Sequence, residues 1–105
     1  KGEALDPSIR RLGLEPYHLV TLRLEHLPQR EKVRLSRRLY GYESVRKYGG
    51  KRYRSRKRGF VEAEGGWKLG RGTFLIPSKA WPALDAILRE HRGKRWGFPV
   101  WIARP

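Results

Sequence analysis

The sequence contains no cysteine, so disulfides, iron–sulfur clusters, zinc ribbons and thiolate nucleophiles are all excluded. It also lacks methionine and asparagine, which like cysteine are chemically fragile at high temperature, and this favours a thermophile. The histidines His18, His26 and His91 do not occur at metal-ligand spacing, and His91 falls on the apolar stripe of an expected helix. We therefore expect a protein that binds no metal and no cofactor.

Long apolar runs are also missing, since none approaches the roughly 18 residues that a membrane-spanning helix needs. The start of the chain lacks the basic, apolar and small-residue pattern of a signal peptide. We therefore expect a cytoplasmic protein that does not enter a membrane. Its 105 residues suffice for one compact domain and are too few for two separate cores, so residues 1–105 are expected to form a single domain.

Acidic residues are scarce, because 10 Asp and Glu stand against 25 Lys and Arg, which gives a formal net charge of +15. A surface so basic indicates a strongly acidic partner: nucleic acid, an anionic membrane surface or an acidic protein. Arginine outnumbers lysine 17 to 8, which favours bidentate phosphate contacts over diffuse point charge. Codon bias in a GC-rich genome is the alternative explanation for the arginine.

The cations concentrate in residues 46–58, where thirteen positions hold eight cations, two tyrosines, a glycine pair and no acid. Such a run repels itself unless a polyanion neutralises it, and this favours nucleic acid as the partner. The pair Gly49-Gly50 suits the positive φ angles of a tight hairpin, so residues 42–58 are expected to form a basic hairpin arm.

The returning strand of this hairpin places alternate residues on one face. Four arginines alternate in this way: Arg52, Arg54, Arg56 and Arg58. They are expected to lie about 6.6 Å apart in succession, close to the spacing of consecutive phosphates in an extended strand.

Tyr42, Tyr48 and Tyr53 lie within the arm, in a setting too polar to be obvious core. Two interpretations stay open: they stack unpaired bases, with Tyr48 at the turn as the leading candidate, or they pack across the hairpin and hold its twist. The four tryptophans are instead expected in the core: Trp67, Trp81, Trp96 and Trp101.

Residues 29–40 have helical periodicity, with Leu35 and Leu39 on an apolar side. Four arginines fall in a narrow sector opposite: Arg30, Arg34, Arg37 and Arg38. An ordinary solvated helix face would explain some charge, but four cations with only Glu31 near their margin favour a phosphate contact.

Period-2 alternation predicts strands over 17–27 and 42–48, and the short apolar run 73–76 predicts a central strand. Residues 60–69 are expected to form further hairpin structure.

A second helix is expected to begin at Ser78, a good N-cap. The last strand, 98–102, contains Pro99 and is therefore expected at a sheet edge. At the start of the chain, residues 1–16 are expected to be a peripheral segment with a short helix capped by Asp6.

Strand–helix–strand units require right-handed crossovers, and two such units around a hairpin give an antiparallel sheet with both helices on one face. The sequence therefore predicts an α+β fold, a ferredoxin-like sandwich that carries an extended basic β-hairpin. Extra strand pairing within residues 60–72 would produce a different α+β sheet, and this alternative stays open.

Candidate catalytic groups are few. Glu62 and Glu64 would share one face of a strand and, with Lys68, imitate a metal nuclease, but the usual spacing of two acids and a lysine is absent. The glycine-rich residues 65–72 match neither a Walker loop nor a dinucleotide fingerprint, and are expected to form a turn and a bulge. We expect no catalytic residue, and hence no enzyme.

The predicted nucleic-acid-binding residues are cations of the helix, the hairpin and the glycine-rich turn, together with two tyrosines. They are Arg30, Arg34, Arg37, Arg38, Arg46, Lys47, Tyr48, Lys51, Arg52, Tyr53, Arg54, Arg56, Lys57, Arg58 and Arg71. In its arginine content, its lack of cysteine and its basic run 46–58, the chain resembles small ribosomal proteins of thermophilic archaea. The resemblance is one of class and implies a protein that holds RNA segments together without chemistry.

Three functions therefore stand as hypotheses. The leading one is non-catalytic RNA binding in a ribosome or another ribonucleoprotein, with ribosomal RNA as partner and neighbouring subunits as further contacts. A DNA-binding or chromatin protein of a thermophile is the second, since phosphate contacts do not distinguish the two sugars. The third, a nucleic-acid-processing enzyme or its accessory subunit, would require a clustered acid pair.

Overall fold

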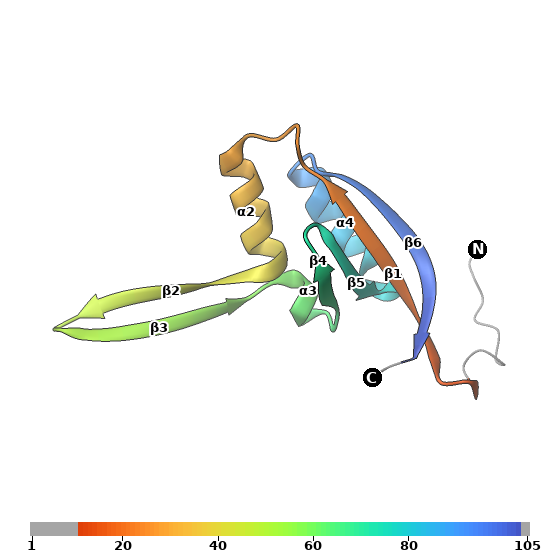
Figure 1. The fold of residues 1–105 in the computed structure, drawn as a ribbon, viewed down its shortest axis with the longest axis horizontal. Helices are drawn as coiled ribbons and strands as arrows, with labels where there is room; N and C mark the ends of the chain where they lie inside the picture. The colour runs from red at the N-terminus through yellow and green to blue at the C-terminus, as the bar shows by residue number, and fades with distance from the viewer. Residues whose placement is uncertain (1–10, 104–105) are drawn as a thin grey trace.

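Two antiparallel sheets, one of four strands and one of two, lie within residues 11–103, which the computed structural model describes (Figure 1). In chain order the elements are β1 (Leu14–Arg23), α2 (Gln29–Tyr40), β2 (Gly41–Tyr48), β3 (Lys51–Arg58), α3 (Phe60–Ala63), β4 (Trp67–Gly70), β5 (Thr73–Pro77), a 3-10 turn (Ser78–Ala80), α4 (Trp81–Glu90) and β6 (Lys94–Ala103). The predicted α+β class and antiparallel sheet are confirmed.

The larger sheet has the strand order β4-β5-β1-β6, so β5 and β1 are central and β6 is an edge strand. All neighbouring strands are antiparallel, with Val20 opposite Phe74 on one side of β1 and Leu19 opposite Phe98 on the other. The central position of β5 and the edge position of β6, which contains Pro99, were both predicted and are confirmed.

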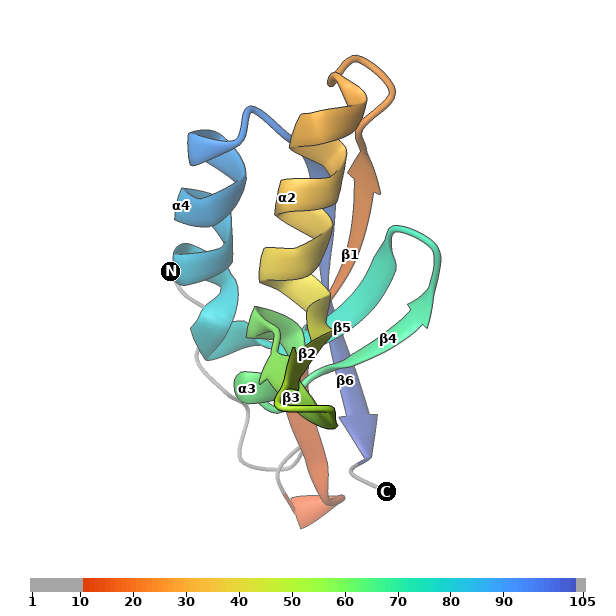
Figure 2. The ribbon, with the colours of Figure 1, turned by 90° about the vertical axis from the view of Figure 1, so that its left-hand side faces the viewer.

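The core lies between this sheet and the helices α2 and α4, which lie side by side against one of its faces (Figure 2). Leu35 and Leu39 of α2 and Leu84 and Leu88 of α4 are all 0% exposed and pack with strand residues such as Phe74. Burial of a side chain of this size stabilises the fold by about 1.5–3 kcal/mol. The apolar faces predicted for both helices are therefore confirmed.

The first strand is shifted from its predicted range of 17–27, because β1 begins at Leu14 and ends at Arg23. Residues 14–16 of the predicted peripheral segment thus belong to the sheet. Gly13, directly before this strand, has φ 76°, a backbone conformation that favours glycine. The predicted cap at Asp6 lies outside the described residues.

Residues 60–63 form the helix α3, and the predicted strand there is wrong. The backbone N–H of Ala63 donates to the carbonyl of Gly59 at 3.0 Å, and the turn so formed buries Val61, which is 3% exposed. β4 then pairs with β5 through a bulge between Lys68 and Gly70, which confirms the turn and bulge predicted for the glycine-rich residues.

Ser78 does not cap the second helix, because it opens the 3-10 turn that precedes α4. Its hydroxyl lies 2.9 Å from Nδ1 of His18 and forms a hydrogen bond there. Pro82 occupies the first turn of α4, where the backbone N–H that proline lacks would have no partner within the helix.

The prediction that all four tryptophans are core residues is wrong for two of them. Trp96 and Trp101 lie on the edge strand β6 and are 48% and 39% exposed. Trp67 and Trp81 are half-buried, and the Trp81 ring stacks on that of His18 with centroids 4.8 Å apart. The core assignment rested on aromatic character alone, although Pro99 already predicted an edge position for the strand that carries Trp101.

The strands β2 and β3 form an arm that projects away from the rest of the protein (Figure 1). The radius of gyration is 16.7 Å, whereas a compact domain of this length has about 13 Å. At the base of the arm, a Cβ on Gly59 would lie 2.4 Å from the backbone of Gly41, and Gly41 itself has φ 83°. Only glycine fits this crossing of the two chain segments.

The edge strand β6 is joined to α4 by Arg95, which donates a hydrogen bond to Asp85, while Arg89 lies 3.0 Å from the same carboxylate. The hydrogen bond from Arg95 is the main cause that holds the pKa of Asp85 below its ordinary value. A carboxylate of lowered pKa stabilises the fold above its unfolded pKa, and this contribution disappears as the pH falls through the folded pKa.

We expect Asp85→Asn to reduce the free energy of unfolding at pH 7 by about 0.5–1 kcal/mol, because the pair is partly open to solvent. Thermal melts from pH 7 to pH 2 measure this. The wild-type protein and the variant are expected to converge at the acidic end. A difference that persists undiminished at pH 2 would contradict an electrostatic role for Asp85.

Candidate nucleic-acid interface

The arm has an arginine face and a tyrosine face. Residues paired across an antiparallel ribbon share a face, and the register places Arg52 opposite Lys47, Arg54 opposite Val45 and Arg56 opposite Glu43. The four alternating arginines of β3 therefore lie on one side, as predicted. Gly49 and Gly50 have φ 55° and 81°, which confirms the predicted positive-φ turn.

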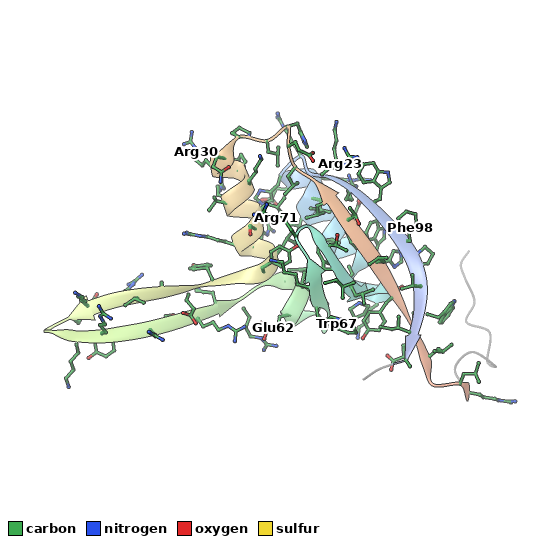
Figure 3. The ribbon with its side chains drawn as sticks, in the orientation of Figure 1. Arg23, Arg30, Glu62, Trp67, Arg71 and Phe98 are labelled. Carbon is green, nitrogen blue, oxygen red and sulfur yellow. The ribbon has the colours of Figure 1, made fainter. Side chains whose placement is uncertain are left out.

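Part of the arginine face is already neutralised within the protein. Glu62 of α3 lies at the base of the arm (Figure 3). Its carboxylate is 3.0 Å from Arg56 and 3.7 Å from Arg58. Within residues 11–103, neither Arg52 nor Arg54 forms an ion pair. Arg52 and Arg54, in the distal half of the face, are thus free to bind phosphate. Arg56 and Arg58, in the proximal half, would have to give up their ion pairs with Glu62 to do so.

The opposite face of the arm holds Tyr48 and Tyr53, whose rings meet edge to face with centroids 6.2 Å apart. Both stay open to solvent, at 64% and 53% exposure, and with Arg46 and Ser55 they line a shallow cavity of about 380 Å³. The two rings pack across the hairpin, which was one of the two interpretations. Base stacking on their exposed sides stays a prediction.

Lysines complete the charge of the arm. Lys47 pairs with Arg52 on the arginine face, while Lys51 and Lys57 lie on the tyrosine face. Like charges placed directly opposite oppose closure of a hairpin, and all of β3 is exposed. Neutralisation by a polyanion would therefore also stabilise the arm itself.

The arginines of α2 lie on the face opposite the core, as predicted, but two of them have partners inside the protein. Arg38 lies 3.0 Å from Glu90 and donates to Nε2 of His91 at 3.2 Å. Arg34 pairs with Glu31 at 3.3 Å. His91 is only 9% exposed and is the packed residue that its position predicted.

The other two arginines of α2 are less engaged. Arg37 lies over the ring of Tyr42, 5.1 Å from its centroid, at the point where the helix passes into the arm. Arg30 extends from the start of the helix (Figure 3). A binding surface that continues from the arm would meet Arg37 first.

Arg71 lies apart from the other predicted binding residues. It belongs to the β4–β5 turn and, with Lys68, lines a cavity against the side of α2 that carries Lys32, Ser36 and Tyr40. Lys32 and Lys68 were not predicted as site residues. The sequence did contain a signal for this side of the helix: Lys32, Ser36 and Tyr40 are spaced four residues apart, which places them along one stripe of α2.

The hypothesis of a strand-borne acid pair is wrong, because Glu62 lies on the helix α3 and Glu64 ends it. Among residues 11–103, no three His, Asp or Glu side chains gather at distances that would hold a metal ion. In the same part of the chain, no helix is long and apolar enough to cross a membrane.

No protein-family model, curated protein or solved structure matches this chain. Functional inference therefore depends on the geometry and charge of the protein itself.

Proposed function

We propose that this protein binds RNA without catalysing a reaction, through the arm formed by β2 and β3. The observation that carries the proposal is the arginine face of a two-stranded ribbon that projects from the body, with Arg52 and Arg54 free of ion pairs in the described chain. Cations on a protruding, exposed ribbon reach phosphates that the body of the protein would not.

RNA is favoured over other polyanions by the opposite face of the same ribbon. Tyr48 and Tyr53 present half-exposed rings beside Arg46, and flat side chains next to cations are what unpaired bases stack on. A membrane surface would require several exposed apolar residues at the tip, where the one large ring, Tyr48, is surrounded by Lys47, Gly49-Gly50 and Lys51.

The setting we propose is the ribosome or another ribonucleoprotein in the cytoplasm of a thermophilic archaeon, where such an arm would enter folded ribosomal RNA beside neighbouring subunits. We further propose that the body is a ferredoxin-like sandwich. Its strand order β4-β5-β1-β6 and its two helices on one face support this, with the arm inserted between α2 and β4.

DNA is a second candidate, favoured by one observation. The arm is a two-stranded antiparallel ribbon, and the major groove of B-form DNA admits such a ribbon, whereas the major groove of A-form RNA is deep and narrow. A DNA complex of this kind would place the arginine face against the groove and its phosphates.

Fluorescence anisotropy with three probes of equal length tests the proposal: a single-stranded RNA, an RNA hairpin with an unpaired loop, and a DNA duplex. At about 150 mM salt we expect the hairpin RNA to bind at least about tenfold more tightly than the duplex DNA, because only unpaired bases can use Tyr48.

Two further outcomes decide between the candidates. Preference for the duplex would contradict RNA binding and favour the DNA candidate, and equal weak binding of all three probes would contradict both. Sedimentation with ribosomal subunits from the native cells, lost at high salt, tests the ribosomal setting separately.

A further inference from the structure

A second feature of the molecule, separate from the arm, is a cavity of about 690 Å³ between α2 and the β4–β5 turn. Cavities of roughly 300–1,000 Å³ are the size that small organic ligands occupy. Its inner wall is apolar: Leu22 and Leu24 on the β1 side are partly exposed, whereas Leu35 and Leu39 of the helix are 0% exposed and belong to the core beneath it.

Three cations surround this apolar wall: Lys32 on α2, Lys68 on β4 and Arg71, which Figure 3 labels in the β4–β5 turn. Within residues 11–103 none of them forms an ion pair, and Glu25 is the one acid among the residues that line the cavity. Other cations of residues 11–103 also lack a carboxylate partner, Arg52 and Arg54 among them, but those two lie on the open surface of the arm. These three instead surround one cavity that also has an apolar wall, and this arrangement favours an anionic ligand.

Tyr40 adds an aromatic surface, and Nζ of Lys68 lies 4.4 Å from the centroid of its ring. Its hydroxyl is buried with no hydrogen-bond partner in the described chain, and burial raises the pKa of Tyr40 to about 12. A tyrosine is neutral at physiological pH even with its ordinary pKa, so this side chain does not repel an anion beside it.

The turn that carries Arg71 is held in place by the backbone. The N–H of Leu22 in β1 donates to the carbonyl of Gly72 at 2.8 Å, and the bulge between Lys68 and Gly70 bends β4 before the turn. Arg71 of the turn, Lys68 of β4 and Lys32 of α2 are thus positioned by separate, packed elements.

We propose that this cavity binds a nucleotide, with the base against Leu22, Leu24 and the Tyr40 ring and the phosphate among Lys32, Lys68 and Arg71. A nucleotide combines a flat, largely apolar ring with a phosphate, and the cavity combines an apolar wall with a cationic rim. The inference goes beyond the proposed function, since the cavity could hold a free nucleotide whether or not the arm binds RNA. An unpaired nucleotide of a bound strand offers the same chemistry.

Isothermal titration calorimetry of the whole chain tests this with four probes: uridine monophosphate, adenosine monophosphate, inorganic phosphate and a uridine hexanucleotide. The cavity variant is Lys68→Gln with Arg71→Gln, and the matched control is Lys79→Gln with Lys94→Gln. All four side chains are exposed and both variants lose two charges, so non-specific attraction falls equally. A third variant, Ser36→Trp, fills the cavity without changing the charge.

We expect the cavity variant and Ser36→Trp each to weaken nucleotide binding at least about tenfold, and the control to change it less than about twofold. Binding of the monophosphates identifies a free nucleotide as the ligand. Binding of the hexanucleotide alone, with the same sensitivity to the variants, identifies a nucleotide within a strand.

Two results would overturn the inference. One is equal affinity for inorganic phosphate and for the nucleotides, because the base would then contribute nothing. The other is that each probe has the same affinity for the wild-type protein, the cavity variant and Ser36→Trp. Absence of binding to all three proteins would count as the same result. Neither result would affect the RNA-binding arm, whose own variants leave the cavity intact.

Discussion

Replacement of the arm arginines with glutamine is expected to reduce both the RNA affinity and its dependence on salt. Removal of one phosphate contact lowers the slope of log affinity against log salt by about 0.7 on a single strand or about 0.9 on a duplex. For the quadruple change at Arg52, Arg54, Arg56 and Arg58, the slope is therefore expected to fall by about 3. Anisotropy titrations between about 50 and about 300 mM salt measure it.

The ion pairs of Glu62 also predict which of the four arginines contribute most to binding. Arg52→Gln with Arg54→Gln removes two free cations, whereas Arg56→Gln with Arg58→Gln removes two that Glu62 already partly neutralises. Both double variants lose the same charge, yet we expect the first to weaken binding more. Glu62→Gln is expected to strengthen binding, because it releases Arg56 and Arg58.

An unchanged slope in the quadruple variant would show that the arm is not the binding element. Equal losses in the two double variants would show instead that the whole arginine face is equally available, and that the internal ion pairs do not persist in solution.

The competition between Glu62 and phosphate gives the arm an expected order of engagement. Free cations at the distal end attract the polyanion first, because no partner has to be displaced. Arg56 and Arg58 can then exchange a single shared carboxylate for phosphates, and that exchange releases Glu62 to solvent. We therefore expect the affinity of the arm for a polyanion to depend on the difference between two sets of charge pairs, and not only on the number of arginines.

The sequence could predict the elements that depend on local chemistry. Residues 29–40 form the predicted helix because Leu35 and Leu39 recur at helical spacing and Gly41, with φ 83°, ends it. The arm turns at Gly49-Gly50 because two consecutive positive φ angles are readily available only to glycine. Neither element needs information from a distant part of the chain.

Features that depend on long-range packing could not be predicted. The helix α3 exists because Val61 is buried, and it is this helix that brings Glu62 to the base of the arm. The cavity between α2 and the β4–β5 turn likewise joins residues that are distant in sequence, such as Lys32 and Arg71. Alternation shows that two faces exist on a strand, but not which face another element covers.

Truncation of a core leucine is expected to have the largest effect on stability. Leu84 is 0% exposed and belongs to the cluster that joins α4, α2 and the sheet, so Leu84→Ala leaves a cavity among closely packed neighbours. We expect the free energy of unfolding to fall by about 2–5 kcal/mol. A protein of this size is stable by only about 5–15 kcal/mol in total, so the melting temperature is expected to fall by many degrees.

Two control variants separate packing from charge in the same melts. Leu12→Ala makes the identical chemical change at a leucine that is 74% exposed, and Arg54→Gln alters the arm alone. Each is expected to change the free energy of unfolding by less than about 0.5 kcal/mol, because neither leaves a cavity or a buried unpaired group. Greater damage from Arg54→Gln than from Leu84→Ala would place the arm within the cooperative core. The arm would then stabilise the fold, and its loss of RNA binding on mutation would no longer be evidence for direct phosphate contact.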